Sequence, residues 1–240
     1  MNLLKFTQKI KPSFEKGGKF GWLHSTFDAF ESFLFVPATV TKSGAHIRDC
    51  MDLKRVMSVV IVALMPAMLF GMWNVGDQHA LAFGLTDMGF WGKFWYGFLR
   101  VLPLIIVSYV VGLGIEFTSA QLRGHEVNEG YLVSGMLIPM IMPVDVPLWI
   151  LAVGVAFAVI IGKEVFGGTG MNIWNPALLA RAFVFFAYPS HISGDKVWIS
   201  GLTDNASAVV DGFSGATPLA QATSNIATPD FLQMFIGNIP

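Results

Sequence analysis

The sequence predicts an all-α, polytopic membrane protein, and three observations support this fold class. Hydrophobic residues occupy 54% of the 240 positions and charged residues only 13%, about half of the roughly 25% found in a typical soluble domain. Two apolar stretches are long enough to cross a bilayer. Two further apolar stretches are short and bounded by glycine and proline. The net charge of −1 gives no indication of nucleic-acid binding, and a single cysteine, Cys50, excludes a four-cysteine iron–sulfur site within this chain.

Residues 1–55 are predicted to form a soluble arm that contains one amphipathic helix. The arm holds nine of the fifteen Lys and Arg residues. Between residues 20 and 34, apolar side chains recur at spacings of 3 and 4, which is the pattern of one helical stripe. The stripe consists of Phe20, Leu23, Phe27, Phe30 and Leu34. It could lie on the membrane surface or pack on a partner subunit, and the sequence favours neither.

The predicted transmembrane region, residues 56–188, begins with two full spans. Residues 56–75 are apolar, and 20 residues at ~1.5 Å each cover the ~30 Å hydrocarbon core. Residues 76–93 are predicted to be a polar loop. The second span runs from about residue 94 to 116, with Trp95 and Tyr96 placed where an aromatic belt is expected.

Two later apolar segments, 131–143 and 176–188, are too short to cross as helices. Thirteen residues reach only ~20 Å. Between them, residues 147–162 are apolar and just long enough to span. Short apolar pieces bounded by Gly and Pro are typical of half-helices in transporter-like folds. The alternative is a pair of partly buried interfacial segments.

Residues 189–240 form a polar tail, and the order of the spans predicts its side of the membrane. The basic arm is expected in the cytoplasm. If both half-helices cross, the chain makes five crossings; if neither does, it makes three. Either number is odd, so the tail is expected on the outer face. Only a mixed case, in which one half-helix crosses, would place it inside.

The tail contains a small, polar motif at residues 211–218 that presents the hydroxyl of Thr217. Gly212 and Gly215 allow another molecule to approach the backbone, and Pro218 biases Thr217 toward an extended conformation. A simple surface turn would have the same composition. The pattern nevertheless resembles the sequence at which a flavin transferase attaches FMN, through its phosphate, to a threonine hydroxyl. The matching residues are Asp211, Ser214, Gly215, Ala216 and Thr217.

A glycine-rich stretch precedes the last short apolar segment. Free backbone N–H groups and the helix dipole at such a place can receive a phosphate, a carboxylate or an anionic flavin. A tight turn that merely needs glycine is an equally good interpretation. Arg181 could pair with a flavin or a carboxylate, or lie solvated at a half-helix end. The candidate contacts are Gly167, Gly168, Thr169, Gly170, Asn175 and Arg181.

Glu116 lies at the end of the second span, one turn after Gly112. A carboxylate near membrane depth is a functional candidate by default, and snorkelling to water is the structural alternative. His125-Glu126-x-x-Glu129 lacks the second histidine of a zinc motif, so no metal site is expected.

Together, these segments resemble the family formed by the B subunits of Na⁺-translocating NADH:quinone reductases and the D subunits of Rnf complexes. The specific matches are at 41–42, 46–49, 52–55, 125–130, 163–175, 185–189, 192–195 and 211–217. The resemblance implies the first five-helix repeat of an inverted-repeat fold, with two half-helices and a polar flavin-bearing loop. It also implies a bacterial inner membrane, with residues 189–240 periplasmic.

The function implied by the resemblance is that of a translocase redox subunit. Covalent FMN on Thr217 would receive electrons from NADH through other subunits of a six-subunit complex, and riboflavin would pass them to quinone while Na⁺ crosses. Gly112 and Glu116 match residues associated with the quinone site. The implied partners are those subunits, a flavin transferase, quinone, Na⁺ and membrane lipid. The long arm favours the reductase family branch over the alternative, the Rnf D subunit of ferredoxin:NAD electron transfer. A non-redox channel or transporter built on half-helices is the third possibility.

Overall fold

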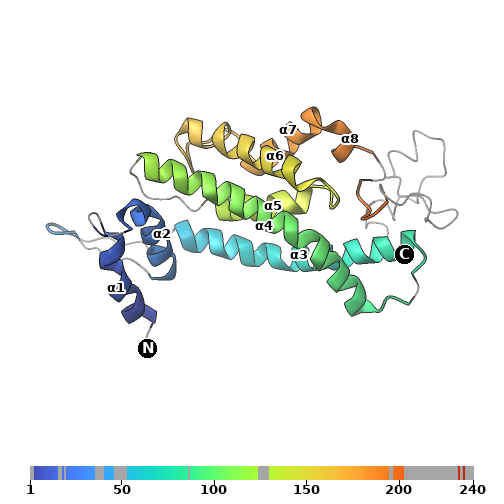
Figure 1. The fold of residues 1–240 in the computed structure, drawn as a ribbon, viewed down its shortest axis with the longest axis horizontal. Coiled ribbons are helices and arrows are strands. Elements are labelled where there is room, and N and C mark those ends of the chain that lie inside the picture. Colours follow the sequence, from blue (N-terminus) through green and yellow to red (C-terminus); the bar gives the residue numbers. More distant parts are fainter. Residues whose placement is uncertain are drawn as a thin grey trace.

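In the computed structural model, the described residues are 3–15, 18, 20–35, 41–45, 53–85, 87–123, 130–194, 197–202, 232 and 235. Within them, every regular element is a helix. Figure 1 shows an elongated bundle with α1 (Leu3–Phe14), the 3₁₀ turn η1 (Gly21–Leu23) and α2 (His24–Leu34) at one end. Residues 197–202 lie at the opposite end. We call these the arm end and the tail end.

Helices α3 (Leu53–Ala82) and α4 (Phe90–Arg123) form the long hairpin of the bundle. Their 30 and 34 residues reach about 45–50 Å at ~1.5 Å each, so both extend beyond a ~30 Å hydrocarbon core. Glycine allows them to touch: a methyl group at Gly76 would overlap the carbonyl of Lys93, and one at Gly97 would overlap that of Met72.

The predicted loop at residues 76–93 is wrong in extent, because α3 continues to Ala82 and α4 already begins at Phe90. Polar side chains in this stretch find partners across the hairpin instead of leaving the helix. Asp77 accepts from the Lys93 ammonium at 2.6 Å. The His79 ring stacks on that of Tyr96, with centroids 4.2 Å apart.

The short apolar helices are confirmed. Helix α5 (Tyr131–Ile141) has 11 residues and α7 (Pro176–Ala187) has 12, about 17 Å each. Helix α6 (Leu148–Ile160) lies between them in sequence and leads into the turn η2 (Glu164–Phe166). Within the described residues, three helical stretches are long and apolar enough to cross a bilayer: 55–82, 90–123 and 148–166. The all-helical, polytopic class is therefore confirmed.

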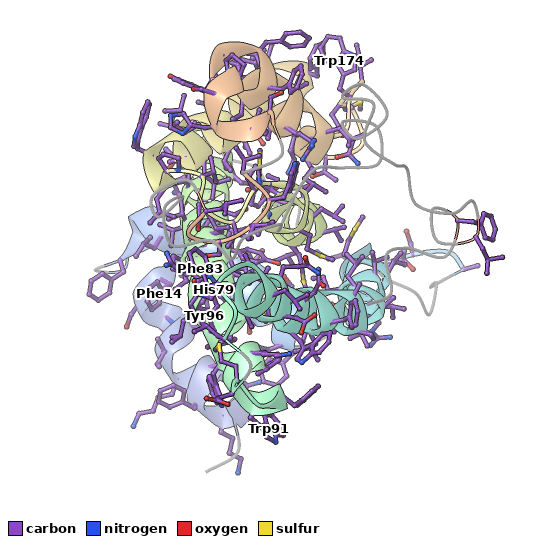
Figure 2. The ribbon with its side chains drawn as sticks, turned by 90° about the vertical axis from the view of Figure 1, so that its right-hand side faces the viewer. Phe14, His79, Phe83, Trp91, Tyr96 and Trp174 are labelled. Atoms are coloured by element: carbon purple, nitrogen blue, oxygen red, sulfur yellow. The ribbon has the colours of Figure 1, made fainter. Side chains whose placement is uncertain are left out.

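The main core joins α4 to the three shorter helices. Tyr131, Ile150, Leu151 and Val184 have no exposed surface, and Phe157 stacks on Phe183 with centroids 4.3 Å apart. The outer faces remain apolar. Figure 2, a view along the bundle from the tail end, shows Trp91 and Trp174 at opposite edges of the molecule, where both rings are exposed.

The arm packs on this chain's own helices. Helix α1 was not predicted, and the amphipathic stretch becomes η1 followed by α2. Phe27 of α2 stacks on Phe14 of α1 with centroids 4.7 Å apart, and Phe30 lies against Phe117 of α4. Lys11 and Glu31 join α1 to α2 by an ion pair of 2.7 Å, whose hydrogen bond raises the pKa of Lys11.

Candidate functional site

One buried charged cluster lies near the arm end, where α4 meets the connection after α6. Lys163 pairs with Glu116, and both side chains are less than 5% exposed. On α4, Glu116 shares one helical face with Ser119 and Arg123 because their spacings are 3 and 4. We call Glu116, Ser119, Arg123, Lys163 and Glu164 the arm-end cluster.

The second carboxylate of the cluster, Glu164, is held from the same helical face. Ser119 donates to Glu164 Oε2 at 2.5 Å. Arg123 donates to the Glu164 carbonyl at 2.8 Å and approaches its carboxylate at 3.6 Å. Each acidic side chain is therefore paired with a basic one, Glu116 with Lys163 and Glu164 with Arg123, which lowers the cost of burying the two carboxylates near membrane depth.

A groove of about 750 Å³ runs along the outer side of α4 beside this cluster. Its walls are mostly apolar, and its polar end is formed by Ser119, Arg123 and Glu164. The other lining residues are Val111, Gly114, Ile115, Thr118, Leu122, Ile160 and Val165. Such a groove suits an elongated apolar molecule with a polar head, because one end offers donors and the rest offers apolar contact.

Glu116 and Gly112, the two residues predicted for a quinone site, are both internal. Glu116 is buried against Lys163, so the snorkelling alternative is wrong. Gly112 lies beneath the Tyr131 ring, which occupies the space that a methyl group would need. The Tyr131 hydroxyl in turn donates to the Ser108 carbonyl at 3.0 Å. Gly112 thus permits α5 to approach α4 closely, and it does not line the groove.

The glycine-rich loop before α7 has the backbone conformation that glycine favours. Gly167, Gly168 and Gly170 have φ values of 115°, 98° and 90°. Asn175 caps α7, since its side-chain oxygen accepts from the Ala177 N–H at 2.9 Å. The predicted anion or flavin contact of this loop, Thr169 and Asn175 included, stays a prediction.

Arg181 lies at the carboxyl end of a half-helix. Its guanidinium donates to the carbonyl of Ile141, the last residue of α5, where a positive charge stabilises the free carbonyl groups. It also lies over the Trp198 ring, 5.2 Å from the centroid. Arg181 thus lies at a half-helix end, as one alternative predicted, but it contacts protein groups there instead of being fully solvated, and its pairing with a flavin stays a prediction.

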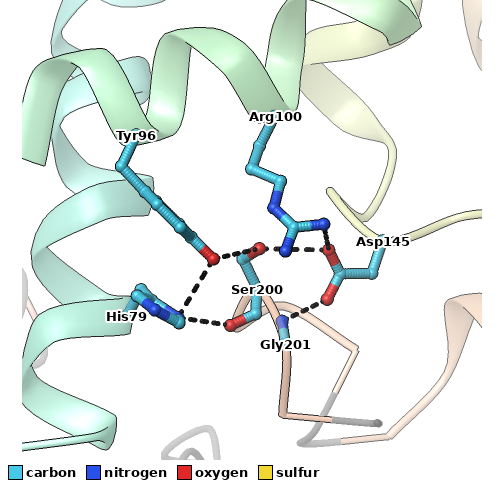
Figure 3. A network of polar contacts seen from close by, with 6 residues as sticks. All are labelled: His79, Tyr96, Arg100, Asp145, Ser200 and Gly201. Atoms are coloured by element: carbon cyan, nitrogen blue, oxygen red, sulfur yellow. Dashed lines mark hydrogen bonds and ion pairs between the residues drawn. The ribbon is translucent and has the colours of Figure 1, made fainter.

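A second polar site occupies the tail end, and Figure 3 shows its side chains pointing toward one another. His79 Nδ1 lies 2.8 Å from the Ser200 carbonyl, and the Tyr96 hydroxyl lies 3.2 Å from both His79 Nδ1 and Ser200 Oγ. Asp145, in the connection between α5 and α6, accepts from Ser200 at 3.1 Å and from the Gly201 N–H. Arg100 approaches Asp145 at 4.0 Å. We call these six residues the tail-end network.

Sequence reasoning missed most of these partners. A charge immediately after the apolar stretch 147–162 was a usable signal for Lys163. No local pattern relates His79, Tyr96, Asp145 and Ser200, which come from four separate segments. The predicted flavin-attachment residues Asp211, Ser214, Gly215, Ala216 and Thr217 lie outside the described residues, as do His125, Glu126 and Glu129.

The curated relatives of this chain reported below all carry the same name. The chain is 43% identical over 246 aligned residues to the B subunit of the Na(+)-translocating NADH-quinone reductase of Ectopseudomonas mendocina, covering 93% of this chain and 59% of that protein. The Azotobacter vinelandii protein of the same name is 42% identical, with the same coverage. That of Pseudoalteromonas atlantica is 40% identical over 267 residues, covering 100% of this chain and 64% of the relative. The chain thus spans about three-fifths of the length of these curated relatives.

A family model matches most of the sequence as well. The match covers residues 40–240, which includes both half-helices, the arm-end cluster and the tail-end network. The chain therefore belongs to the NQR2, RnfD, RnfE family.

Proposed function

We propose that this chain serves as the B subunit of a Na⁺-translocating NADH:quinone reductase, a membrane redox subunit that carries FMN on Thr217. The observation that carries the proposal is that relatives 40–43% identical over 93–100% of the chain bear this name. The relative from Pseudoalteromonas atlantica covers the whole chain, the arm included. This coverage favours the reductase over the Rnf complex within the same family.

Thr217 would carry the flavin as a phosphoester. Its oxygen bonds to the phosphorus nearest the flavin in a flavin dinucleotide, the diphosphate bond breaks, and the nucleotide leaves as the hydroxyl proton is released. The bound FMN supplies the electron-transfer chemistry. Asp211 would be recognised by the transferase, near a metal ion that favours carboxylate oxygen. Because Gly215 has no side chain and Ala216 only a methyl group, neither would hinder the transferase sterically at Thr217.

The position of residues 197–202 supports a tail on the outer face. They lie at the end of the bundle opposite the arm (Figure 1), and the arm carries the excess of basic residues that favours the cytoplasm. The tail-end network ties them to α3 and α4. The position of residues 197–202 thus supports access of a periplasmic transferase to Thr217.

Quinone would bind in the groove beside the arm-end cluster. Its apolar wall suits an isoprenoid tail, and the guanidinium of Arg123 at its polar end has further N–H groups that can donate to a carbonyl oxygen. Glu116 acts through the cluster, because removing it leaves the Lys163 charge buried without its partner. Glu116→Ala is therefore expected to lower quinone reduction more than flavin reduction by NADH. Equal loss of both activities would remove this role, and Asp87→Asn, at an exposed loop position, is the control.

The attachment site is tested by substituting Thr217 in the chain co-expressed with its transferase. Thr217→Val removes the hydroxyl at nearly constant volume and should abolish in-gel flavin fluorescence. Thr217→Ser keeps the nucleophilic oxygen and should retain part of it. Covalent fluorescence that persists after Thr217→Val would contradict the assignment.

The electron donor separates the two redox complexes of the family. FMN reduced by NADH in the assembled complex supports the quinone reductase, whereas a requirement for reduced ferredoxin supports the Rnf complex. A purified chain without flavin absorbance would instead favour the channel or transporter.

A further inference from the structure

Helix α2 of the arm has an exposed apolar edge, although it is not one of the long membrane-crossing helices. Phe30 is 57% exposed and Leu34 is 52% exposed, and their spacing of four places both on one face of the helix. Other apolar side chains of α2 are covered, since Phe27 stacks on α1 and Ala29 is buried with Ala120 of α4. Within the described residues, the edge formed by Phe30 and Leu34 is left exposed.

The contact between Phe30 and Phe117 gives the depth of this edge. Helix α4 has 34 residues and measures about 51 Å, so a ~30 Å hydrocarbon core centred on it leaves about 10 Å of helix outside at each end. Phe117 lies six residues before Arg123, the last residue of α4, which is about 9 Å. The Phe30 ring lies against that of Phe117, with centroids 6.1 Å apart. The edge is therefore at the boundary between acyl chains and headgroups.

The orientation of the arm helices also suits this boundary. Figure 1 shows α1 and α2 running across the direction of α3 and α4. Because α3 and α4 include stretches long and apolar enough to cross the bilayer, a helix that runs across them lies along the membrane plane. Asp28 and Ser32 are on the face of α2 opposite Phe30 and Leu34. An amphipathic helix in this position can bury its apolar edge among acyl chains and keep its polar face in water.

The charge of the arm complements an anionic leaflet. Residues 1–55 contain nine basic and five acidic residues, which gives a net charge of +4 with His neutral, whereas the whole chain has a net charge of −1. Lys5 and Lys9 share one face of α1, and both are exposed, as is Lys42. Basic residues close to a membrane surface are attracted by anionic headgroups. The apolar edge and the basic charge thus fit the two layers of one leaflet.

We propose that the arm is an interfacial anchor that binds anionic phospholipid at the arm end of the bundle. Phe30 and Leu34 enter the acyl region, and the basic residues of the arm attract the headgroups. The partner is lipid because the edge continues the apolar surface of α4 through Phe117 at the depth where acyl chains end. This inference needs only the membrane-spanning fold, and it is independent of the flavin proposed for Thr217.

The first test identifies what covers the edge. The complete complex is placed in nanodiscs of phosphatidylcholine and phosphatidylglycerol, with p-benzoylphenylalanine in place of Leu34. Irradiation should add the mass of one phospholipid to the fragment that contains position 34. The same probe in place of Asp28, on the opposite face of α2, is the matched control and should give at least fivefold less lipid adduct.

Two results of this experiment would overturn the proposal. One is a crosslink from position 34 to another subunit or to a second segment of this chain, because the edge would then be a protein contact. The other is the absence of any adduct at position 34 while a probe in place of Ile106, which is 51% exposed on α4, reacts under the same irradiation.

The second test measures the dependence on lipid charge by amide hydrogen exchange of residues 24–34. In the wild-type complex, exchange should be about fivefold or more slower in discs with phosphatidylglycerol than in discs of phosphatidylcholine alone, which is about the effect of one basic residue near an anionic surface. Lys5→Gln combined with Lys9→Gln should remove most of this difference. Gln8→Ala, at an exposed uncharged position of α1, should preserve it. Equal exchange of the wild type in both kinds of disc would contradict the binding of anionic lipid.

A third variant tests the apolar edge by itself. Leu34→Asp leaves the contacts of Phe27 and Ala29 in place but puts a charge at the acyl boundary, so exchange of α2 should accelerate in both kinds of disc. Leu34→Phe keeps the edge apolar and should exchange as slowly as the wild type. Wild-type exchange in Leu34→Asp would show that the edge does not enter the leaflet. All of these readouts are independent of flavin and of activity, so they decide the anchor even if Thr217 carries no FMN.

Discussion

Removal of Lys163 tests the energetics of the arm-end cluster most sharply. Lys163→Met keeps the length of the side chain but deletes the charge opposite Glu116, whose side chain is 4% exposed. Breaking a buried ion pair by removing one partner typically costs about 3–5 kcal/mol. Glu116→Gln, which leaves the Lys163 charge buried, should cost a similar amount.

The double variant decides whether these costs come from the pair itself. With both charges gone, the buried site holds no uncompensated ion, and such replacements are often neutral or stabilising. We therefore expect Lys163→Met with Glu116→Gln to lie within about 2 kcal/mol of wild type, which gives a coupling of at least about 4 kcal/mol. Arg123→Met is the matched control: its side chain is 43% exposed, and an exposed ion pair contributes about 1 kcal/mol or less.

The assay is the thermal midpoint of the purified complex in one detergent, followed by size-exclusion fluorescence after heating. At about 2–4 °C per kcal/mol for a chain of this size, each single variant should lose roughly 6–20 °C, and Arg123→Met at most about 4 °C. The reasoning is refuted if Lys163→Met loses no more than Arg123→Met, or if the double variant loses the sum of the two single losses.

Two further predictions concern packing and pH. Gly112→Ala forces a methyl group into the Tyr131 ring and should cost about 1–3 kcal/mol, whereas Gly114→Ala, with open space around it, should be neutral or slightly stabilising; thermal midpoints compare them. Because its partner Glu31 raises the pKa of Lys11, their pair stabilises the arm below the unfolded pKa of ~10.4 and is lost as pH rises through the folded value. Glu31→Gln should therefore destabilise by up to about 1 kcal/mol at pH 7 and by almost nothing once the pH exceeds the folded pKa of Lys11, and an equal deficit on both sides of that pKa would contradict this origin.

Local sequence patterns predicted which segments form helices better than they predicted the residues at which those helices begin and end. The boundaries of α5 and α7 follow from Gly and Pro, which end helices for local steric reasons. The predicted loop at 76–93 was too long because its polar composition was interpreted as the end of the helix, whereas Asp77 and His79 lie within α3. Their partners on α4 can be recognised only once the two helices are paired.

The candidate sites were also predicted only in part, because their side chains find partners far away in the sequence. The charge of Glu116 near membrane depth marked it as either functional or snorkelling to water, and the structure shows it buried and paired instead. The sequence could not identify Lys163, 47 residues away, as the partner. The tail-end network is even harder to predict from the sequence, because its hydrogen bonds join residues up to 121 positions apart.

Attachment of FMN to Thr217 is tested by the mass of the 211–221 fragment from wild-type chain co-expressed with its flavin transferase. We expect an increase equal to one FMN less one water, with fragmentation placing it on Thr217. An unmodified fragment, from a preparation in which the transferase modifies a reference substrate, would contradict it.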